Sequence, residues 1–197
     1  MAAQPRKRCW ESADPAYNDY HDQEWGLPVV DERGLYERLC LEGFQSGLSW
    51  LTILRKREAF RAAFAGFDPE QVARFGERDI KRLLGDAGIV RHRGKIEAAI
   101  ANAGATVALR ETGTTLPQLV WSHRPKRPRV PRSRNDWQAS TPDSVALAKA
   151  LRAAGFRFVG PTTVYAAMQA CGVVDDHLAT CPARPAAERA LAAAGLL

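Results

Sequence analysis

The sequence has no apolar run long enough to cross a membrane as a helix. Its opening stretch, Met1 to Arg8, is polar and basic without an apolar core behind it, so it cannot act as a secretory signal. It also has no low-complexity tract long enough to prevent a packed core, and 46% of its 197 residues are hydrophobic. We therefore expect a soluble, globular protein of the cytoplasm, associated with the nucleoid if the source is bacterial.

Cysteine is scarce, with four residues in the chain. In a reducing cytoplasm these are expected to be thiols or metal ligands rather than disulfides. Cys9 and His21 lie near one end of the chain, and His177 and Cys181 lie near the other, four positions apart and on one face if that segment is helical. Two cysteines and two histidines make a tetrahedral zinc set, and four protein ligands leave no open position, so such a zinc would be structural. The alternative is two buried thiols and two ordinary histidines.

Acidic residues are fewer than basic ones. There are 22 Asp and Glu against 28 Lys and Arg, which gives a net charge of +6 and a pI near 9.4. The excess suits a polyanionic partner, although simple solubility explains it equally well. Three basic residues cluster in the tail at 1–8 and six in a segment at 122–140. Both clusters can reach phosphates, but the recurring prolines of the second favour a solvated, exposed loop over 117–142.

Strand-like alternation is rare, whereas apolar positions recur at helical spacing. This pattern predicts a mainly α fold, which we expect as a single unit over residues 1–197. The Ala-rich stretch at 185–197 holds little apolar bulk and is expected as a loosely packed tail.

Glycine and proline punctuate the helical pattern. Gly43 and Gly47 are expected breaks between two helices, and Gly85 to Gly88 a tight turn in a helix, hairpin, helix pattern. Helix starts, marked by a capping residue or a first-turn proline, are predicted at Asp68-Pro69, Thr141-Pro142 and Pro161.

Aromatic residues make up 8% of the chain, yet many of them gather in its first quarter around one carboxylate, Glu42. The rings concerned are Trp10, Tyr17, Tyr20, Trp25 and Trp50. A flipped base needs flat apolar walls, and Glu42 can accept hydrogen bonds from an adenine amino group. A cationic base gains further attraction from electron-rich rings and a carboxylate. Without further information, ordinary core packing of the rings and a surface position for Glu42 are the better supported alternatives.

Several sequence motifs occur in a fixed order along the chain. They are Asp14-Pro15-Ala16-Tyr17, Tyr20-His21-Asp22-Gln23-Glu24-Trp25-Gly26, Leu41-Glu42-Gly43, Gln45-Ser46-Gly47-Leu48-Ser49-Trp50, Lys56-Arg57-Glu58, Gly88-Ile89-Val90-Arg91-His92-Arg93-Gly94-Lys95-Ile96, Gly155-Phe156-Arg157-Phe158-Val159-Gly160, Met168-Gln169-Ala170-Cys171-Gly172 and Asp176-His177. Together they closely resemble the signatures of the 3-methyladenine DNA glycosylase I family, from about Cys9 to Cys181.

The resemblance implies a helix-hairpin-helix glycosylase fold with a structural zinc on the four Cys and His residues named above. It also implies that Glu42, Tyr20 and Trp50 line the pocket for the excised base, with the other three rings as supporting walls. Gly47 and Leu48 become candidates for filling the space that a flipped nucleotide leaves, with ordinary packing as the alternative for Leu48. The implied partner is double-stranded DNA with alkylated bases, and we expect a monomer without an obligate protein partner.

The implied reaction is hydrolysis of an N-glycosidic bond, in which water attacks the sugar carbon as the base leaves and abasic DNA remains. We expect a monofunctional enzyme, because nothing in the sequence marks Lys95 as a lyase nucleophile. Three alternatives stay open. A non-catalytic DNA-binding module would show steep salt dependence without base release, a zinc hydrolase would lack one of the four ligands, and the same enzyme could prefer a different alkylated base.

Overall fold

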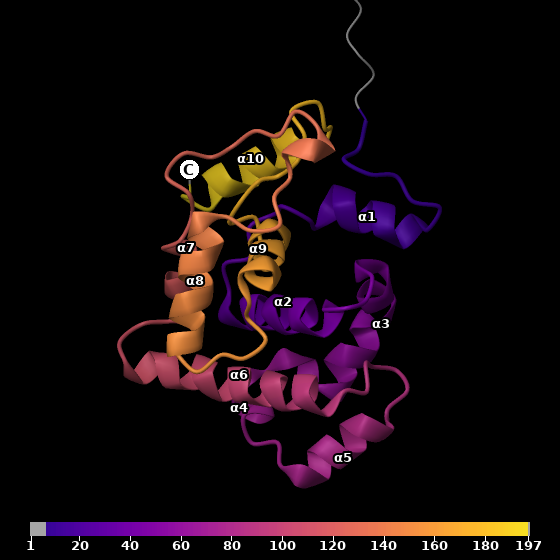
Figure 1. Ribbon diagram of the computed structural model, residues 1–197, viewed down its shortest axis with the longest axis vertical. Helices are drawn as coiled ribbons and strands as arrows, with labels where there is room; N and C mark the ends of the chain where they lie inside the picture. Colours follow the sequence, from indigo (N-terminus) through magenta and orange to yellow (C-terminus); the bar gives the residue numbers. More distant parts are fainter. Residues whose placement is uncertain (1–6, 197) are drawn as a thin grey trace, which may run out of the picture.

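The computed structural model describes residues 7–196, and all regular structure in that range is helical. The predicted mainly α fold is therefore confirmed, while Arg6 of the expected basic tail lies outside the described residues. The helices within residues 7–196 (Figure 1) are α1 Pro15–Gln23, α2 Glu32–Gln45, α3 Trp50–Ala63, η1 Ala65–Phe67, α4 Pro69–Val72, α5 Glu77–Gly85, α6 Arg93–Glu111, α7 Leu116–Trp121, η2 Arg134–Asp136, α8 Pro142–Ala153, α9 Pro161–Ala170 and α10 Arg184–Ala193. None of them has the length and hydropathy needed to span a bilayer.

Helix α2 lies at the centre of the molecule and packs against α3, α6, α7 and α9 (Figure 1). Its side chains are buried on nearly every face, from Leu35 through Phe44. Each large apolar side chain buried in this way stabilises the fold by roughly 1.5–3 kcal/mol. The one hydroxyl among them is satisfied, because the Tyr36 hydroxyl donates to the carbonyl of Ala99 on α6 at 2.9 Å. Glu42 lies on the last turns of this helix, so its position is fixed by the core around it.

The predicted helix starts are confirmed, because each carries a local signal, either a capping side chain or a first-turn proline. The Asp68 carboxylate accepts the backbone N–H groups of Glu70 and Gln71 before α4, and Thr141 accepts that of Ser144 before α8. Pro161 lies in the first turn of α9.

The prediction that Gly43 breaks a helix is wrong, because α2 continues through it to Gln45. The predicted break at Gly47 is confirmed, because the chain turns at residues 46–49, where Gly47 has a φ of +83°, in the region that favours glycine. Lys95 explains the position of this turn. Its Nζ donates to the carbonyls of Phe44 at 2.9 Å and Ser46 at 2.6 Å, and so satisfies carbonyls at the end of α2.

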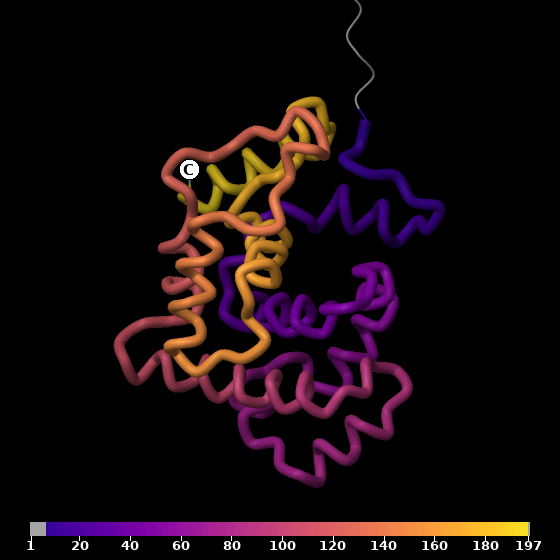
Figure 2. Tube along the Cα trace, viewed as in Figure 1, coloured from indigo at the N-terminus to yellow at the C-terminus, as the bar shows by residue number. Residues whose placement is uncertain are grey.

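The expected exposed loop over 117–142 is only partly present. Its first residues continue α7, and it contains η2. The segment before α8 runs beside the C-terminal segment (Figure 2), and the Ala179 N–H donates to the carbonyl of the buried Pro131 at 2.8 Å. The basic side chains at 126–134 are exposed, as predicted for a solvated loop. The backbone of the same segment is not fully solvated, because Pro131 is buried and hydrogen-bonded to the C-terminal segment.

The chain near its C-terminus also differs from expectation. Residues 176–182 form no helix, since 176–178 are irregular and a turn follows at 179–180, so His177 and Cys181 are not placed by helical spacing. The Ala-rich stretch forms α10, whose Ala187 and Leu191 are buried. The turn predicted at residues 85–88 lies between α5 and α6, and the Gly88 N–H donates to Asp86 Oδ1 at 2.7 Å.

Candidate active site

The six pocket residues predicted from the sequence lie around one cavity of about 210 Å³. They come from the N-terminal segment, α1 and the turn after it, α2 and the start of α3. Four further residues line the same cavity. These are Gln45, Trp137, Ala166 and Gln169.

The cavity walls are mainly rings in mutual contact. Trp10 and Trp25 meet edge to face with ring centroids 4.8 Å apart, and Tyr20 and Trp50 lie 5.3 Å apart. Such pairs add about 0.5–1.5 kcal/mol beyond area burial. The indole Nε1 atoms of Trp10 and Trp50 are buried and have no hydrogen-bond partner among the described residues. A buried donor without a partner is costly, so two donors at this cavity suit a ligand with acceptor atoms.

Glu42 is the carboxyl group of the cavity, and its residue is only 5% exposed. Burial raises the pKa of Glu42 to about 8, although the positive charge of Arg38 opposes the rise. Arg38 is itself engaged, since it donates to Glu24 at 2.7 Å and lies 5.7 Å from the centre of the Tyr20 ring. The pocket therefore holds a carboxyl group that is largely neutral when the cavity is empty at neutral pH, and a cation beside it would favour its ionised form.

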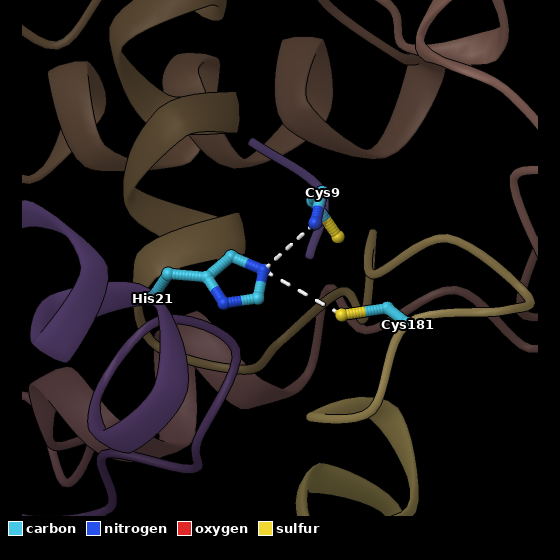
Figure 3. Close-up of side chains that lie close together, drawn as sticks. All are labelled: Cys9, His21 and Cys181. Atoms are coloured by element: carbon cyan, nitrogen blue, oxygen red, sulfur yellow. Dashed lines mark hydrogen bonds between the residues drawn. The ribbon is translucent and has the colours of Figure 1, made fainter. Parts of the chain in front are cut away.

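A second cluster joins the two ends of the chain. Donor atoms of Cys9, His21 and Cys181 all lie within 4.8 Å of one another and all three residues are buried (Figure 3). His21 Nε2 lies 3.5 Å from Cys181 Sγ. A zinc ion bound tetrahedrally by one nitrogen and one sulfur separates them by roughly 3.5 Å, because the two bonds are about 2.0 and 2.3 Å long. These three residues therefore fit a zinc ion.

His177 lies next to this cluster, with its ring centroid 5.3 Å from that of His21, but its donor atoms are outside the group of three. Its Nε2 is buried and has no hydrogen-bond partner among the described residues. In both histidines Nδ1 is close to a carboxylate, at 2.8 Å from Asp22 for His21 and 2.7 Å from Asp175 for His177. Carboxylates commonly orient metal-binding histidines in this way, leaving Nε2 for the metal, so His177 suits the role of a fourth ligand.

The two thiols of the cluster differ in protonation, because the hydrogen bond with Cys181 and burial raise the pKa of Cys9, whereas the pKa of Cys181 is lowered. Hydrogen bonds from Cys9 and His21 hold the pKa of the Cys181 thiol below its usual value, although burial opposes this. A thiolate is the form that binds zinc.

A glycine is required at position 26 beside the cluster. A Cβ there would lie 2.6 Å from Cε1 of His177, and Gly26 has a φ of +80°, which favours glycine.

Comparison with known proteins identifies the family of this chain. The sequence matches the methyladenine glycosylase family over residues 10–184. The chain belongs to the methyladenine glycosylase family. It is 49% identical over 182 residues to DNA-3-methyladenine glycosylase 1 of Escherichia coli (strain K12), which covers 91% of this chain and 97% of that relative.

Two solved structures of methyladenine glycosylases are also similar. A crystal structure of 3-methyladenine DNA glycosylase I matches with a TM-score of 0.86 and 50% identity, over 89% of this chain and 98% of that chain. A structure of the Staphylococcus aureus enzyme, described for its recognition of 3-methyladenine, matches with a TM-score of 0.84 and 38% identity, over 88% of this chain and 94% of that chain.

In this methyladenine glycosylase, Trp137 is a wall that sequence reasoning missed. Its ring centroid lies 6.1 Å from that of Trp25 and 6.4 Å from that of Trp10. It comes from the basic segment, which is further fastened by a 2.7 Å hydrogen bond from Arg134 Nε to the carbonyl of Cys9. The sequence contains one indication of this role. Trp137 is a large aromatic side chain among charged residues and prolines, and such a side chain is unusual in a fully solvated loop.

The titration of Glu42 in this methyladenine glycosylase gives a testable dependence of stability on pH. The pKa of Glu42 is higher in the folded protein than in the unfolded chain, so the unfolded chain loses this proton at lower pH. The free energy of unfolding therefore decreases as the pH rises from the usual pKa of 4.5 to about 8. A glutamine side chain does not ionise, so we expect Glu42→Gln and wild type to be similarly stable at pH 5 and the variant to be more stable at pH 8, by about 4 kcal/mol.

Denaturant unfolding of both proteins at pH 5, 7 and 8 measures this difference. A free-energy gap that stays constant across the three pH values would contradict a raised pKa for Glu42.

Proposed function

We propose that the chain is a base-excision-repair DNA glycosylase that hydrolyses the N-glycosidic bond of 3-methyladenine in alkylated DNA and leaves an abasic site. The observation that carries this proposal is a single cavity that combines Glu42 with ring walls, in a chain of this family. The related enzymes named above are 3-methyladenine DNA glycosylases by name.

In the proposed reaction, alkylation at N3 has already made the base a good leaving group, so the protein mainly has to recognise it. The rings stack on the flipped base, and its positive charge lowers the pKa of Glu42 and favours the carboxylate. Water then attacks the sugar carbon as the bond to the base breaks, and the sugar passes through a state of oxocarbenium character. The products are the free base and an abasic sugar.

We propose that the enzyme is monofunctional. Lys95 is the candidate for a lyase nucleophile, but it is 8% exposed and its Nζ donates to two backbone carbonyls. Although burial lowers its pKa, an amine held in this way supports the turn at 46–49 and is not free to attack a sugar.

We propose that Cys9, His21, His177 and Cys181 hold one structural zinc ion. Such an ion supplies no reaction chemistry and fastens the N-terminal segment to the C-terminal one. The same residues position the pocket, because Trp10 follows Cys9 and its ring lies 4.6 Å from the His21 ring. We also propose that the enzyme acts as a monomer on double-stranded DNA.

Release of 3-methyladenine from methylated duplex DNA by the purified protein tests the proposed function. A folded, metal-loaded protein that binds DNA without releasing base would instead favour the DNA-binding module.

We propose that Leu48 fills the gap that the flipped nucleotide leaves, with Gly47 allowing the turn that presents it. Leu48 is 42% exposed and follows the Glu42 helix by a short turn. We expect Leu48→Ala to lower kcat/KM for 3-methyladenine release by about tenfold, because an unfilled gap lets the base return to the stack.

Val30→Ala is the matched control for Leu48→Ala, since Val30 is 50% exposed and does not line the cavity. Both variants should keep the melting temperature of wild type. Equal kcat/KM in the two variants would remove Leu48 from the proposed role.

A further inference from the structure

Asp176 gathers three hydrogen-bond donors at the edge of the base cavity. Its Oδ2 accepts the Tyr165 hydroxyl at 2.5 Å and the Gln169 side-chain Nε2 at 2.7 Å. Its backbone carbonyl accepts the Trp137 indole N–H at 3.0 Å. Asp176 is 6% exposed, and two of its three donors, Gln169 and Trp137, are walls of the cavity.

This network fixes which end of the Gln169 amide is available to a ligand. A carboxylate only accepts hydrogen bonds, so the NH₂ group of Gln169 has to face Asp176. A flipped amide would place its oxygen against the Asp176 oxygen, which is repulsive. Besides the second N–H of this amide, Gln169 has its carbonyl Oε1, a hydrogen-bond acceptor held on the side away from Asp176, and Gln169 lines the same cavity as Glu42.

We propose that Gln169 determines purine specificity by offering its amide oxygen as a fixed acceptor to the exocyclic amino group of an adenine lesion. This inference rests on the proposed function. Adenine carries an amino donor at carbon 6, whereas guanine carries a carbonyl acceptor there. An acceptor that cannot rotate pairs with the amino group of adenine. The carbonyl oxygen of guanine would instead face the amide oxygen, and neither oxygen would have a hydrogen-bond donor. Asp176 and Tyr165 are positioning residues that prevent the rotation.

The test compares the kcat/KM values for release of 3-methyladenine and 3-methylguanine from methylated duplex DNA. We expect Gln169→Leu to lower the ratio of the two values by about tenfold, mainly through slower release of 3-methyladenine. Tyr165→Phe removes one anchor of Asp176 and leaves the Gln169 side chain in place, so it should lower the ratio by a smaller factor. Gln138→Leu, on an exposed residue outside the cavity, is the matched control and should leave the ratio unchanged.

A purely structural role for Gln169 would lower both values together and leave the ratio unchanged, which would overturn this inference alone. Absence of any base release by wild type would overturn the proposed function and the inference with it. Melting temperature and bound metal are measured for every variant, because Asp176 precedes His177 in the chain. If Gln169→Leu does not fold, Gln169→Met keeps the length of the side chain and is subject to the same comparison.

Discussion

Glu42→Gln is expected to lower the rate of 3-methyladenine release by about 100-fold or more, in line with the loss of one preorganised electrostatic group at a reacting centre. Glutamine keeps the size of the side chain and one acceptor oxygen but cannot carry a negative charge. The base is cationic until the glycosidic bond breaks, and Glu42 is buried among rings, where a charge interaction is screened less than in water. Single-turnover release from methylated duplex DNA measures the effect.

The control for this variant is Glu58→Gln, which makes the same chemical change on α3 at a side chain that is 81% exposed. It should release base at the rate of wild type. Because a neutral amide avoids the cost of a buried charge, Glu42→Gln is also expected to remain folded. Undiminished release by a folded Glu42→Gln would remove Glu42 from the recognition role and leave the rings alone to select the base.

Five of the six predicted cavity residues, all but Trp10, belong to the continuous motifs that carry the resemblance. Tyr17, Tyr20 and Trp25 lie within about two helical turns of one another, and Glu42 and Trp50 flank one short turn. The motifs that carry the resemblance therefore also place these side chains close together. Trp137 could not be found in this way. Its place depends on contacts with Trp10 and Trp25, more than 100 residues away, and on the Asp176 carbonyl, none of which leaves a local pattern.

Local signals also explain which helix boundaries were predictable. Asp68-Pro69 and Thr141-Pro142 carry their own caps, and Asp14-Pro15 has the same signal at the start of α1, where no helix was predicted. Gly43 misled the prediction because a glycine inside a helix costs only about 1 kcal/mol relative to alanine. Burial of most of α2 outweighs that cost, and the break is instead placed by Lys95, a contact from a distant helix.

The metal cluster and the base cavity share their supports, which links stability to activity. Helix α1 carries Tyr20 into the cavity and His21 into the cluster at adjacent positions. Cys9 and Trp10 are adjacent in the same way, and on the other side Asp176, which anchors two cavity walls, precedes His177. Loss of the proposed zinc ion should therefore displace the walls of the cavity as well as the ends of the chain.

Cys181→Ser is accordingly expected to lower bound zinc from about one equivalent to near zero and to lower the melting temperature by about 10–20 °C, with loss of base release. Zinc binding at structural sites is worth on the order of 10 kcal/mol, and only part of this is recovered by a hydroxyl ligand. Metal analysis, thermal unfolding and the release assay are run on the same preparation. Cys171→Ala is the matched control, because Cys171 is equally buried but lies outside the cluster, and it should keep its zinc. If wild type purifies without zinc and Cys181→Ser keeps the melting temperature of wild type, the cluster is a set of packed thiols and histidines, and the pocket owes its position to ring packing alone.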